Sequence, residues 1–360
     1  MTESGRTNRH LGETVAGILH GAWRRNPPEL ELAESELDRV TPLLLASGAA
    51  SLGWWRVRNS NLKSTQSALE LQQAYRLHSL QSALHQSEIT DLVSLARDAG
   101  AEPVLVKGWA VARLYPEMGL RPYGDVDLCF SKESYAKAEA AFANLDRTRY
   151  QVDLHEGFSK LDNLGSEQLL SRSRPISIGG MEVRVLGEED QLRILCTHAL
   201  RHSVWRPLWL CDIAVAIETR SPEFDWQRCV GRDAREADWV ACAIGLAHRF
   251  LGARIEGTPV EQRANALPGW LVRRTLKNWS APFPELYPPL SYTRPFVTYF
   301  RDPTGLVRTL RMRWPDPIEA TIRMRGPFNS FPRWPYQVAN ASRRITMFLG
   351  GLLGTGPKTG

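Results

Sequence analysis

Hydrophobic residues recur every three or four positions through most of the first hundred residues, and this spacing predicts helices. One such segment runs from Leu32 to Leu45, and a much longer one runs from Leu62 to Ala99, where Gly100 ends it. The long segment repeats its apolar residues near the helical period, at Leu69, Leu71, Tyr75, Leu77, Leu80 and Leu84. We expect a helical N-terminal region, residues 1–100, that packs against the core and walls one side of a cleft.

Short apolar segments typical of strands follow, with one helical segment, Lys132 to Leu145, among them. The expected strands cover residues 103–106, the apolar run ending at Phe130, residues 150–155, residues 158–161, and a hairpin over 176–186 that turns at Gly179-Gly180. Together they predict an α+β unit, residues 101–187, in which a small mixed β-sheet carries a helix or two on one face.

Helical spacing returns after Gly187, where three acidic residues, 188–190, suit the positive end of a helix. Further helices are expected over 192–200, 208–217, 226–230, 239–251 and 270–279. These segments predict a helical domain, residues 188–280. Prolines become frequent after Ala281, so residues 281–360 are expected to form a Pro-rich, basic segment that wraps over the surface as a loop.

The stretch from Val104 to Phe130 carries the clearest chemical pattern. An apolar run stops at Lys107-Gly108, and a second strand-like run further on contains Asp125 and Asp127. Residues two apart on a strand point to the same face, and two carboxylates held that close are costly unless a cation joins them. Because Mg²⁺ takes carboxylate and phosphate oxygens as ligands, the pattern predicts a metal site for a nucleoside triphosphate. The alternative is a polar strand end that faces water.

Other residues near the two aspartates are candidates for the same site. Gly108 allows close approach of the backbone to phosphate, Lys107 supplies a point charge, and Arg121 supplies a forked donor. The alternatives are a solvated lysine at a strand end and a loop arginine that caps carbonyls. Asp153 is a candidate third carboxylate, and His155 on the same expected strand is a possible pocket residue. Three carboxylates and two metal ions suffice for in-line displacement at an α-phosphorus.

These residues resemble a known family. Lys107-Gly108, Arg121-Pro122 and residues 124–128 (GDVDL) are similar to the signature of the uncharacterised bacterial nucleotidyltransferases of the DNA polymerase beta-like superfamily. Residues 151–155 (QVDLH) resemble the family's third-carboxylate strand, and residues 189–213 resemble its helical segment. The resemblance covers roughly residues 80–216 and leaves both ends of the chain unexplained.

The resemblance implies a polymerase-beta-like sheet and transfer of a nucleoside monophosphate from a nucleoside triphosphate, with Mg²⁺ or Mn²⁺ as cofactor and release of pyrophosphate. It implies Asp125, Asp127 and Asp153 as metal ligands, and it leaves the acceptor open among a small molecule, a peptide, a protein and a tRNA. The sequence departs from the family at Trp109, where a small residue is usual. An alternative function is therefore a decayed transferase sheet, with Trp109 filling the nucleotide site, that acts as a binding module for RNA or an anionic surface through its basic C-terminal segment.

The helical domain supplies further candidates for the pocket. His198 and His202 lie four residues apart and share a helix face, but no third zinc ligand is evident nearby. We expect these histidines to line a pocket or to pack, as we do for Asp212. Trp205 and Trp209 fit a helix interface better than a base-binding role.

The net charge of +6 is concentrated at the end of the chain. From Arg294 onward, ten arginines and one lysine face three acidic residues, which leaves the remainder slightly acidic. Aromatic residues lie among these arginines. Three interpretations stay open: a grip on RNA, contact with an anionic membrane surface, and a solvated basic surface with the aromatics packed inward.

The remaining composition points to a protein of the cytoplasm. The 43% hydrophobic and 23% charged residues are ordinary for a globular protein. The five cysteines are scattered without a CxxC pair, as expected of buried thiols in a reducing compartment. The start lacks the pattern of a signal peptide, and no apolar run approaches the length of a transmembrane helix.

Overall fold

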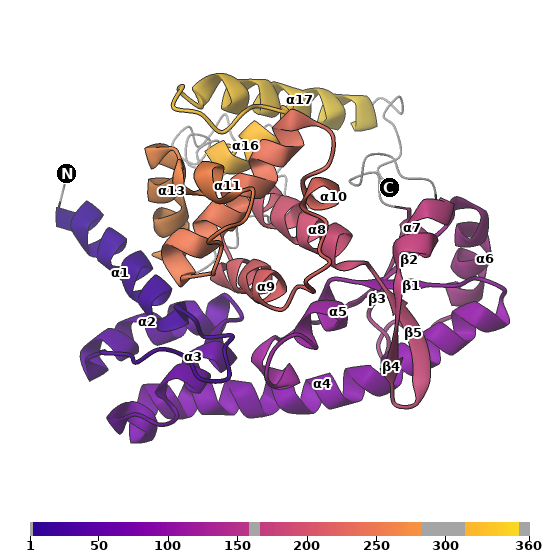
Figure 1. Ribbon diagram of the computed structural model, residues 1–360, viewed down its shortest axis with the longest axis horizontal. Coiled ribbons are helices and arrows are strands. Elements are labelled where there is room, and N and C mark those ends of the chain that lie inside the picture. The colour runs from indigo at the N-terminus through magenta and orange to yellow at the C-terminus, as the bar shows by residue number, and fades with distance from the viewer. Residues whose placement is uncertain (1–2, 158–165, 282–313, 353–360) are drawn as a thin grey trace.

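A 33-residue helix, α4 (Gln66–Asp98), runs along one side of the protein in the computed structural model, which describes residues 3–157, 166–281 and 314–352 (Figure 1). Its first turns bury Ala68 and Leu71 in one large hydrophobic cluster, and its last turns bury Leu92 and Ala96 in a second cluster under the sheet. The helix therefore belongs to both cores. Within the described residues there are fifteen α-helices and one five-stranded sheet, which confirms the predicted α+β class.

The N-terminal region is helical, as predicted. It contains α1 (Glu3–Leu19), α2 (Glu34–Ala46), α3 (Ala50–Val57) and the short 3₁₀ helix η1 (Asn61–Ser64) before α4. One detail of the prediction is wrong. Four of the leucines expected to pack against the core lie on the solvent side of α4 and are 45–61% exposed: Leu69, Leu77, Leu80 and Leu84. Apolar residues surround this helix on more than one side, so their spacing alone did not identify the buried face.

The sheet has the strand order β3-β2-β1-β5-β4. Its strands are β1 (Val104–Val106), β2 (Val126–Phe130), β3 (Val152–Glu156), β4 (Arg174–Ile178) and β5 (Met181–Val185). β1 pairs antiparallel with β2 and parallel with β5, β2 pairs parallel with β3, and β4 with β5 forms the predicted hairpin through Gly179 and Gly180. The expected strand at 158–161 lies outside the described residues.

The two faces of the sheet differ in what covers them. On one face Leu128 and Phe130 pack with Phe142 of α6 (Lys132–Phe142) and with the end of α4. On the other face Val104 and Cys129 pack with Ile194 of α8 (Glu188–Arg201). Three short elements complete this unit: α5 (Gly108–Ala112), η2 (Met118–Leu120) and α7 (Ser166–Arg172). The second face is covered only in part, and the candidate site lies on it.

The helices after the sheet pack with those before it. They are α8, α9 (Pro207–Glu218), α10 (Trp226–Val230), α11 (Ala234–Leu251), α12 (Glu261–Asn265) and α13 (Gly269–Trp279). Buried residues of α1, α2, α3, α8, α9 and α11 form one hydrophobic cluster. Arg24 also ties the first region to the second, because its guanidinium lies 2.6 Å from the Glu218 carboxylate. The division of the chain at residues 100, 187 and 280 stays a prediction.

The C-terminal segment corrects an expectation. Residues 282–313 lie outside the description, but residues 314–352 form two helices rather than a loop: α16 (Pro317–Arg323) and α17 (Trp334–Leu352). The prolines of this segment occur where helices accept them, since Pro317 is in the first turn of α16 and Pro335 in that of α17. None of the described helices has the length and apolar character needed to cross a membrane.

Candidate functional site

Strand register brings the predicted carboxylates together. β2 and β3 run parallel with Asp127 opposite Asp153, and with Cys129 opposite His155. Asp125 precedes Asp127 by two residues, so all of these side chains except the thiol form a polar group on one face of the sheet. This is the face opposite the layer made by α4 and α6.

Asp127 is the centre of this group. Its side chain is 5% exposed, and its Oδ1 accepts hydrogen bonds from Lys107 Nζ at 2.7 Å and from His155 Nε2 at 2.7 Å. Burial acts to raise the pKa of Asp127, but the hydrogen bond from His155 and the charge of Lys107 outweigh it and hold the pKa below its ordinary value. Asp127 is therefore a carboxylate at neutral pH, with two donors in place.

The pKa of Asp125 is shifted in the opposite direction, upward. It remains accessible at the start of β2, yet desolvation by the surrounding protein and the charge of Asp127 raise the pKa of its carboxyl, and Lys107 offsets this only in part. Two carboxylates on one face thus have pKa values pushed apart, a pattern common at sites that bind cations or move protons.

The donor set fits a divalent cation. The ligating atoms of Asp127, Asp153 and His155 all lie within 4.8 Å of one another. Two carboxylates and an imidazole suit Mn²⁺ well and are compatible with Mg²⁺, which prefers oxygen ligands. Asp125 shares the face but lies outside this group of three. His155, predicted only as a pocket residue, takes its place beside the other two aspartates.

The turn after β1 places Lys107 and Gly108 next to the aspartates. Lys107 has a φ of 50° and Gly108 a φ of 24°, which are strained values for residues with a side chain. A Cβ atom at position 108 would lie 3.3 Å from the Asp125 carbonyl oxygen, so the backbone passes close to the carboxylate strand there. Trp109 is 5% exposed and packs in the cluster of the opposite face, so its ring does not cover the aspartates.

Arg121 and Asp212 form an ion pair with each other. Arg121 Nη2 lies 2.8 Å from Asp212 Oδ2, and the Tyr115 hydroxyl donates to Asp212 Oδ1 at 2.8 Å. Asp212 is fully buried, and a buried charge is tolerated only when it is paired. The pair therefore ties the segment before β2 to α9. This geometry gives Arg121 a positioning role and does not support its expected contact with phosphate.

Arg206 is a candidate that sequence reasoning missed. It follows a turn in which Ser203 and Val204 have φ values of 59° and 52°, and side chains of α13 bind both carbonyls, Asn278 at 2.7 Å and Trp279 at 2.7 Å. The Arg206 guanidinium lies 4.7 Å from the Trp205 ring centre, and the Asp125 carboxylate is among the charges that act on it. Its Nε is buried with no hydrogen-bond partner in the part of the chain that the structure describes. The turn brings Arg206 near the site, and no spacing of residues in the sequence predicts this position.

His198 of α8 and His202, the residue after its end, form an aromatic group rather than a metal site. The ring centres of His198 and His202 are 4.5 Å apart, and both rings contact Trp209, at 4.9 and 5.4 Å. Neither histidine belongs to the possible metal cluster found among the described residues. The packing role expected for Trp209 agrees with this arrangement.

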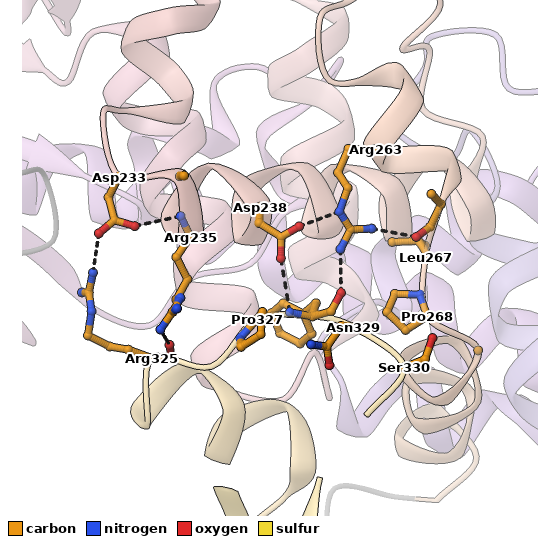
Figure 2. Close-up of a pocket in the computed structure, with 14 residues that line it drawn as sticks. Asp233, Arg235, Asp238, Arg263, Leu267, Pro268, Arg325, Pro327, Asn329 and Ser330 are labelled. Carbon is orange, nitrogen blue, oxygen red and sulfur yellow. Dashed lines mark hydrogen bonds and ion pairs between the residues drawn. The ribbon is translucent and has the colours of Figure 1, made fainter. Parts of the chain in front are cut away.

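A cavity of about 420 Å³ opens beside the start of β2 and β3. Its lining comes from α4, from the loop after α2, from the strand ends and from the start of α9, and it includes His78, His85, Tyr123, Gly124, Gln151 and Arg206. α4 therefore forms one wall of this cavity, which reaches Gly124, the residue before Asp125. That the helical region walls the active cleft stays a prediction. A larger cavity of about 1000 Å³ lies elsewhere, between α11, α13 and the turn before α17, and contains none of the predicted site residues (Figure 2).

Comparison with known proteins agrees with this geometry. A family model described as "Uncharacterised nucleotidyltransferase" matches residues 33–252, more than half of the chain. The match includes α4, the whole sheet and the helices α8 and α9. No curated protein and no solved structure matches the chain. From the family match and the carboxylate sheet that it spans, the chain belongs to this family of uncharacterised nucleotidyltransferases.

Proposed function

We propose that the protein transfers a nucleoside monophosphate from a nucleoside triphosphate to an acceptor and releases pyrophosphate, with Mg²⁺ or Mn²⁺ as cofactor. One observation carries the proposal: parallel pairing of β2 with β3 sets Asp127 beside Asp153, with Lys107 and His155 bonded to the same Asp127 oxygen. A carboxylate group with a neighbouring cationic side chain is suited to hold a metal–triphosphate complex.

Different residues of the site serve the cation and the substrate. Asp127, Asp153 and His155 would hold the cation, and Asp125 lies on the same face of the sheet beside them. When bound, the metal neutralises phosphate charge and lowers the pKa of the attacking hydroxyl. The remaining tasks are to bind, orient and neutralise the substrate.

Two cationic side chains serve the phosphates. Lys107 Nζ now lies against Asp127, and a bound triphosphate offers the ammonium a second anionic partner at the same place. Arg206, whose charge interacts with that of Asp125, replaces Arg121 as the forked donor. Gly108 leaves room for close approach of the backbone.

The position of Trp109 favours transfer over the alternative of a decayed binding module. A filled nucleotide site requires the indole to lie above the aspartates, whereas it packs with the core on the other face. The acceptor belongs in the polar cavity beside Gly124 and Gln151, which adjoins the carboxylate edge of the sheet. Its class remains one of four: small molecule, peptide, protein or tRNA.

The test is transfer of label from each nucleoside triphosphate in the presence of Mg²⁺ or Mn²⁺ and a cell lysate. Two parallel reactions carry the label on the α- or the γ-phosphorus. Nucleotidyl transfer places only α-label in a protein, RNA or small-molecule fraction, and the fraction names the acceptor class. Incorporation of γ-label instead contradicts the proposal and indicates phosphoryl transfer.

Control variants separate the site from the fold. Asp127→Asn and Asp153→Asn are expected to lower transfer by at least ~100-fold, because each removes a charged ligand. Glu139→Gln removes an exposed carboxylate of α6, on the other side of the sheet, and should leave transfer unchanged. Transfer that survives in Asp127→Asn with a stable fold would reject the metal site.

A further inference from the structure

The last helix presents its apolar side outward. Trp334, Val338 and Ile345 recur at helical spacing along α17 and are 64%, 43% and 60% exposed, and Phe331 just before the helix is 72% exposed. We call these four residues the α17 stripe. In an ordinary surface helix the apolar side faces the core, so the orientation of α17 is inverted.

The polar side of α17 holds the helix on the protein. Asn340 is 1% exposed, Gln337 Nε2 donates to the Pro315 carbonyl at 2.7 Å, and Arg344 Nη2 lies 2.7 Å from Glu319 of α16. α16 lies beneath α17, on the side of the protein away from α4 (Figure 1). The outward stripe is therefore set by specific polar contacts on the inner side.

The segment that leads into α17 is fixed to the helical body. Arg263 Nη2 donates to the Phe328 carbonyl at 2.7 Å. Its Nε lies 2.5 Å from Asp238 of α11, the pair labelled in Figure 2. Trp270 Nε1 donates to the Asn329 carbonyl at 2.7 Å. These bonds come from α11, α12 and α13, so three elements hold the turn before the stripe.

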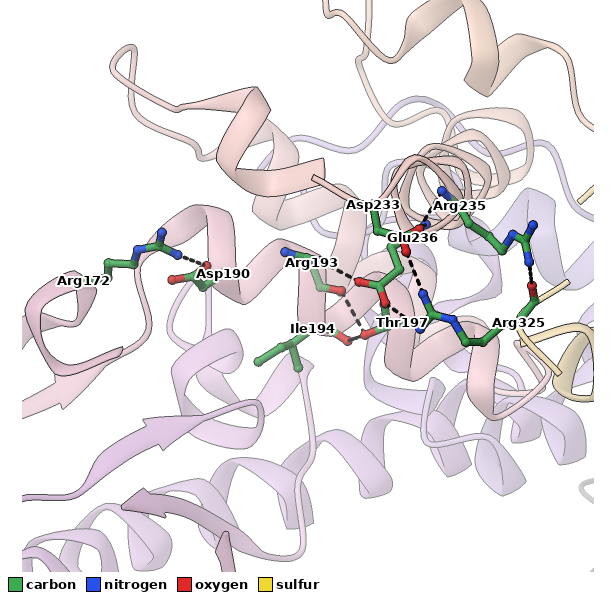
Figure 3. Close-up of polar contacts among 9 residues, drawn as sticks. All are labelled: Arg172, Asp190, Arg193, Ile194, Thr197, Asp233, Arg235, Glu236 and Arg325. Atoms are coloured by element: carbon green, nitrogen blue, oxygen red, sulfur yellow. Dashed lines mark hydrogen bonds and ion pairs between the residues drawn. The ribbon is translucent and has the colours of Figure 1, made fainter. Parts of the chain in front are cut away.

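Ion pairs extend this attachment to the centre of the protein. Arg325 lies 2.7 Å from Asp233 and 3.1 Å from Glu236, and Glu236 also pairs with buried Arg193 of α8 at 2.6 Å (Figure 3). The segment that precedes the α17 stripe is thus joined through ion pairs to α11 and, through Glu236, to α8.

We propose that the α17 stripe docks on the surface of an anionic lipid bilayer. α17 contains two arginines and no acidic residue. Arg344 shares the single carboxylate of Glu319 with Arg323, and exposed Arg343 flanks the stripe, so this side of the protein carries net positive charge. Aromatic and aliphatic side chains beside arginines fit the boundary between headgroups and acyl chains. A second copy of this chain would bring the same positive charge to the contact, whereas anionic headgroups complement it.

The docking is peripheral. The described helices include none able to span a bilayer, so the stripe enters only the interfacial layer. The proposal is independent of the nucleotidyl transfer proposed above, because α17 lies outside the family match and contributes no residue to the carboxylate site.

The test is co-sedimentation of the full-length protein with vesicles of phosphatidylcholine alone and of phosphatidylcholine with phosphatidylglycerol. The protein should pellet with the anionic vesicles, and binding should fall as salt rises above ~0.1 M, where the Debye length is ~10 Å. Trp334→Ser and Ile345→Ser should each weaken binding about tenfold, because each removes a large apolar side chain from the interface. Arg343→Gln should weaken binding to anionic vesicles about fivefold.

The matched control is Leu80→Ser on α4, which removes a leucine that is 61% exposed on the other side of the protein. It should leave vesicle binding unchanged, and circular dichroism should show all variants folded. Equal binding to neutral and anionic vesicles, or full binding by Trp334→Ser, would overturn the proposal. A dimer in sedimentation velocity that Trp334→Ser dissociates, with no vesicle binding, would instead assign the stripe to self-association.

Discussion

Asp125 and Asp127 are two residues apart on one strand, yet their surroundings act on them in opposite directions. The pKa of Asp127 is lowered, because the hydrogen bond from His155 and the charge of Lys107 outweigh its burial. The pKa of Asp125 is raised, by desolvation first and by the Asp127 charge second. Ionisation of Asp127 therefore stabilises the folded protein, whereas ionisation of Asp125 destabilises it.

Neutral variants should show these opposite signs. At pH 7 and without metal, Asp127→Asn is expected to cost about 1–3 kcal/mol of unfolding free energy, because Lys107 and His155 lose their charged acceptor. Asp125→Asn is expected to raise the unfolding free energy by about 0.5–1 kcal/mol, because it relieves repulsion. Urea denaturation measures both.

The pH dependence gives an independent control. The contribution of Asp127 is complete above its unfolded pKa of about 3.9 and is lost as pH falls through its lower folded pKa, so the deficit of Asp127→Asn should shrink in acid. The gain of Asp125→Asn should also vanish in acid, once the wild-type carboxyl is protonated. A destabilised Asp125→Asn at pH 7 would contradict this account.

Residue types and local spacing were enough to predict that Asp125, Asp127 and Asp153 share one face near Lys107, because the strand period fixes which side chains share a face; their roles stay predictions. They were not enough for Arg121. Its partner, Asp212, lies 91 residues away, and only the packing of α9 against the sheet unit brings the two charges together. Arg206 was missed for the same reason.

At the scale of elements, the turn between α8 and α9 has an unusual backbone. Ser203 and Val204 both have positive φ, although neither is glycine, and Asn278 and Trp279 hold their carbonyls. Strain of this kind persists only where the surrounding structure enforces it, and it is common at functional sites. Here Arg206, which follows the turn, lines the cavity beside Gly124 and Gln151.

Removing one of the two clamps should loosen Arg206. Asn278→Ala is expected to cost about 1 kcal/mol of unfolding free energy and to weaken binding of a triphosphate more than it lowers the folded population. A shift of melting temperature with added triphosphate and Mg²⁺ measures the binding. Ser203→Gly is the matched variant, because glycine accepts positive φ, and it should be stabilising by about 0.5–1 kcal/mol. Unchanged triphosphate binding in Asn278→Ala would refute the positioning role.

The elements themselves were predicted unevenly. The strands of the described residues, the hairpin and α4 were predicted from the spacing of apolar residues and from turn residues. The segment that forms α17 was expected to be a loop. The prolines of this segment suggested irregular structure. A surface helix is normally recognised by an apolar side that packs on the core, whereas the apolar stripe of α17 faces outward. The exposed leucines of α4 were assigned to the wrong side because apolar residues occur around the whole helix.

At the scale of the whole molecule, one ion pair joins the beginning of the chain to the helical region after the sheet. Arg24 Nε and Nη2 donate to both oxygens of Glu218, at 2.9 and 2.6 Å, and Trp23 Nε1 donates to the same carboxylate. Burial acts to raise the pKa of Glu218, but the hydrogen bond from Arg24 prevails and lowers it. The contact links α9 to the segment after α1.

Glu218→Gln should therefore destabilise the whole protein by about 2 kcal/mol at neutral pH, because a half-buried arginine loses its charge partner. The loss should decrease as pH falls below about 4.3, the unfolded pKa of glutamate, since the wild-type bond is itself lost as pH falls through the lower folded pKa. Calorimetry at several pH values measures it. If only α1–α3 melt early in this variant, the shared core does not act as one unit.

Because α4 contributes to both hydrophobic cores, it limits where the protein can be truncated. Leu92 and Ala96 close the underside of the sheet, while Ala68 and Leu71, on the same continuous helix, lie in the other core. A truncated chain that starts at Gly100 would keep every candidate ligand of the cation. It would lose Leu92 and Ala96, which pack against one face of the sheet. A fragment expected to keep a folded carboxylate sheet must therefore retain at least the last turns of α4, which carry Leu92 and Ala96.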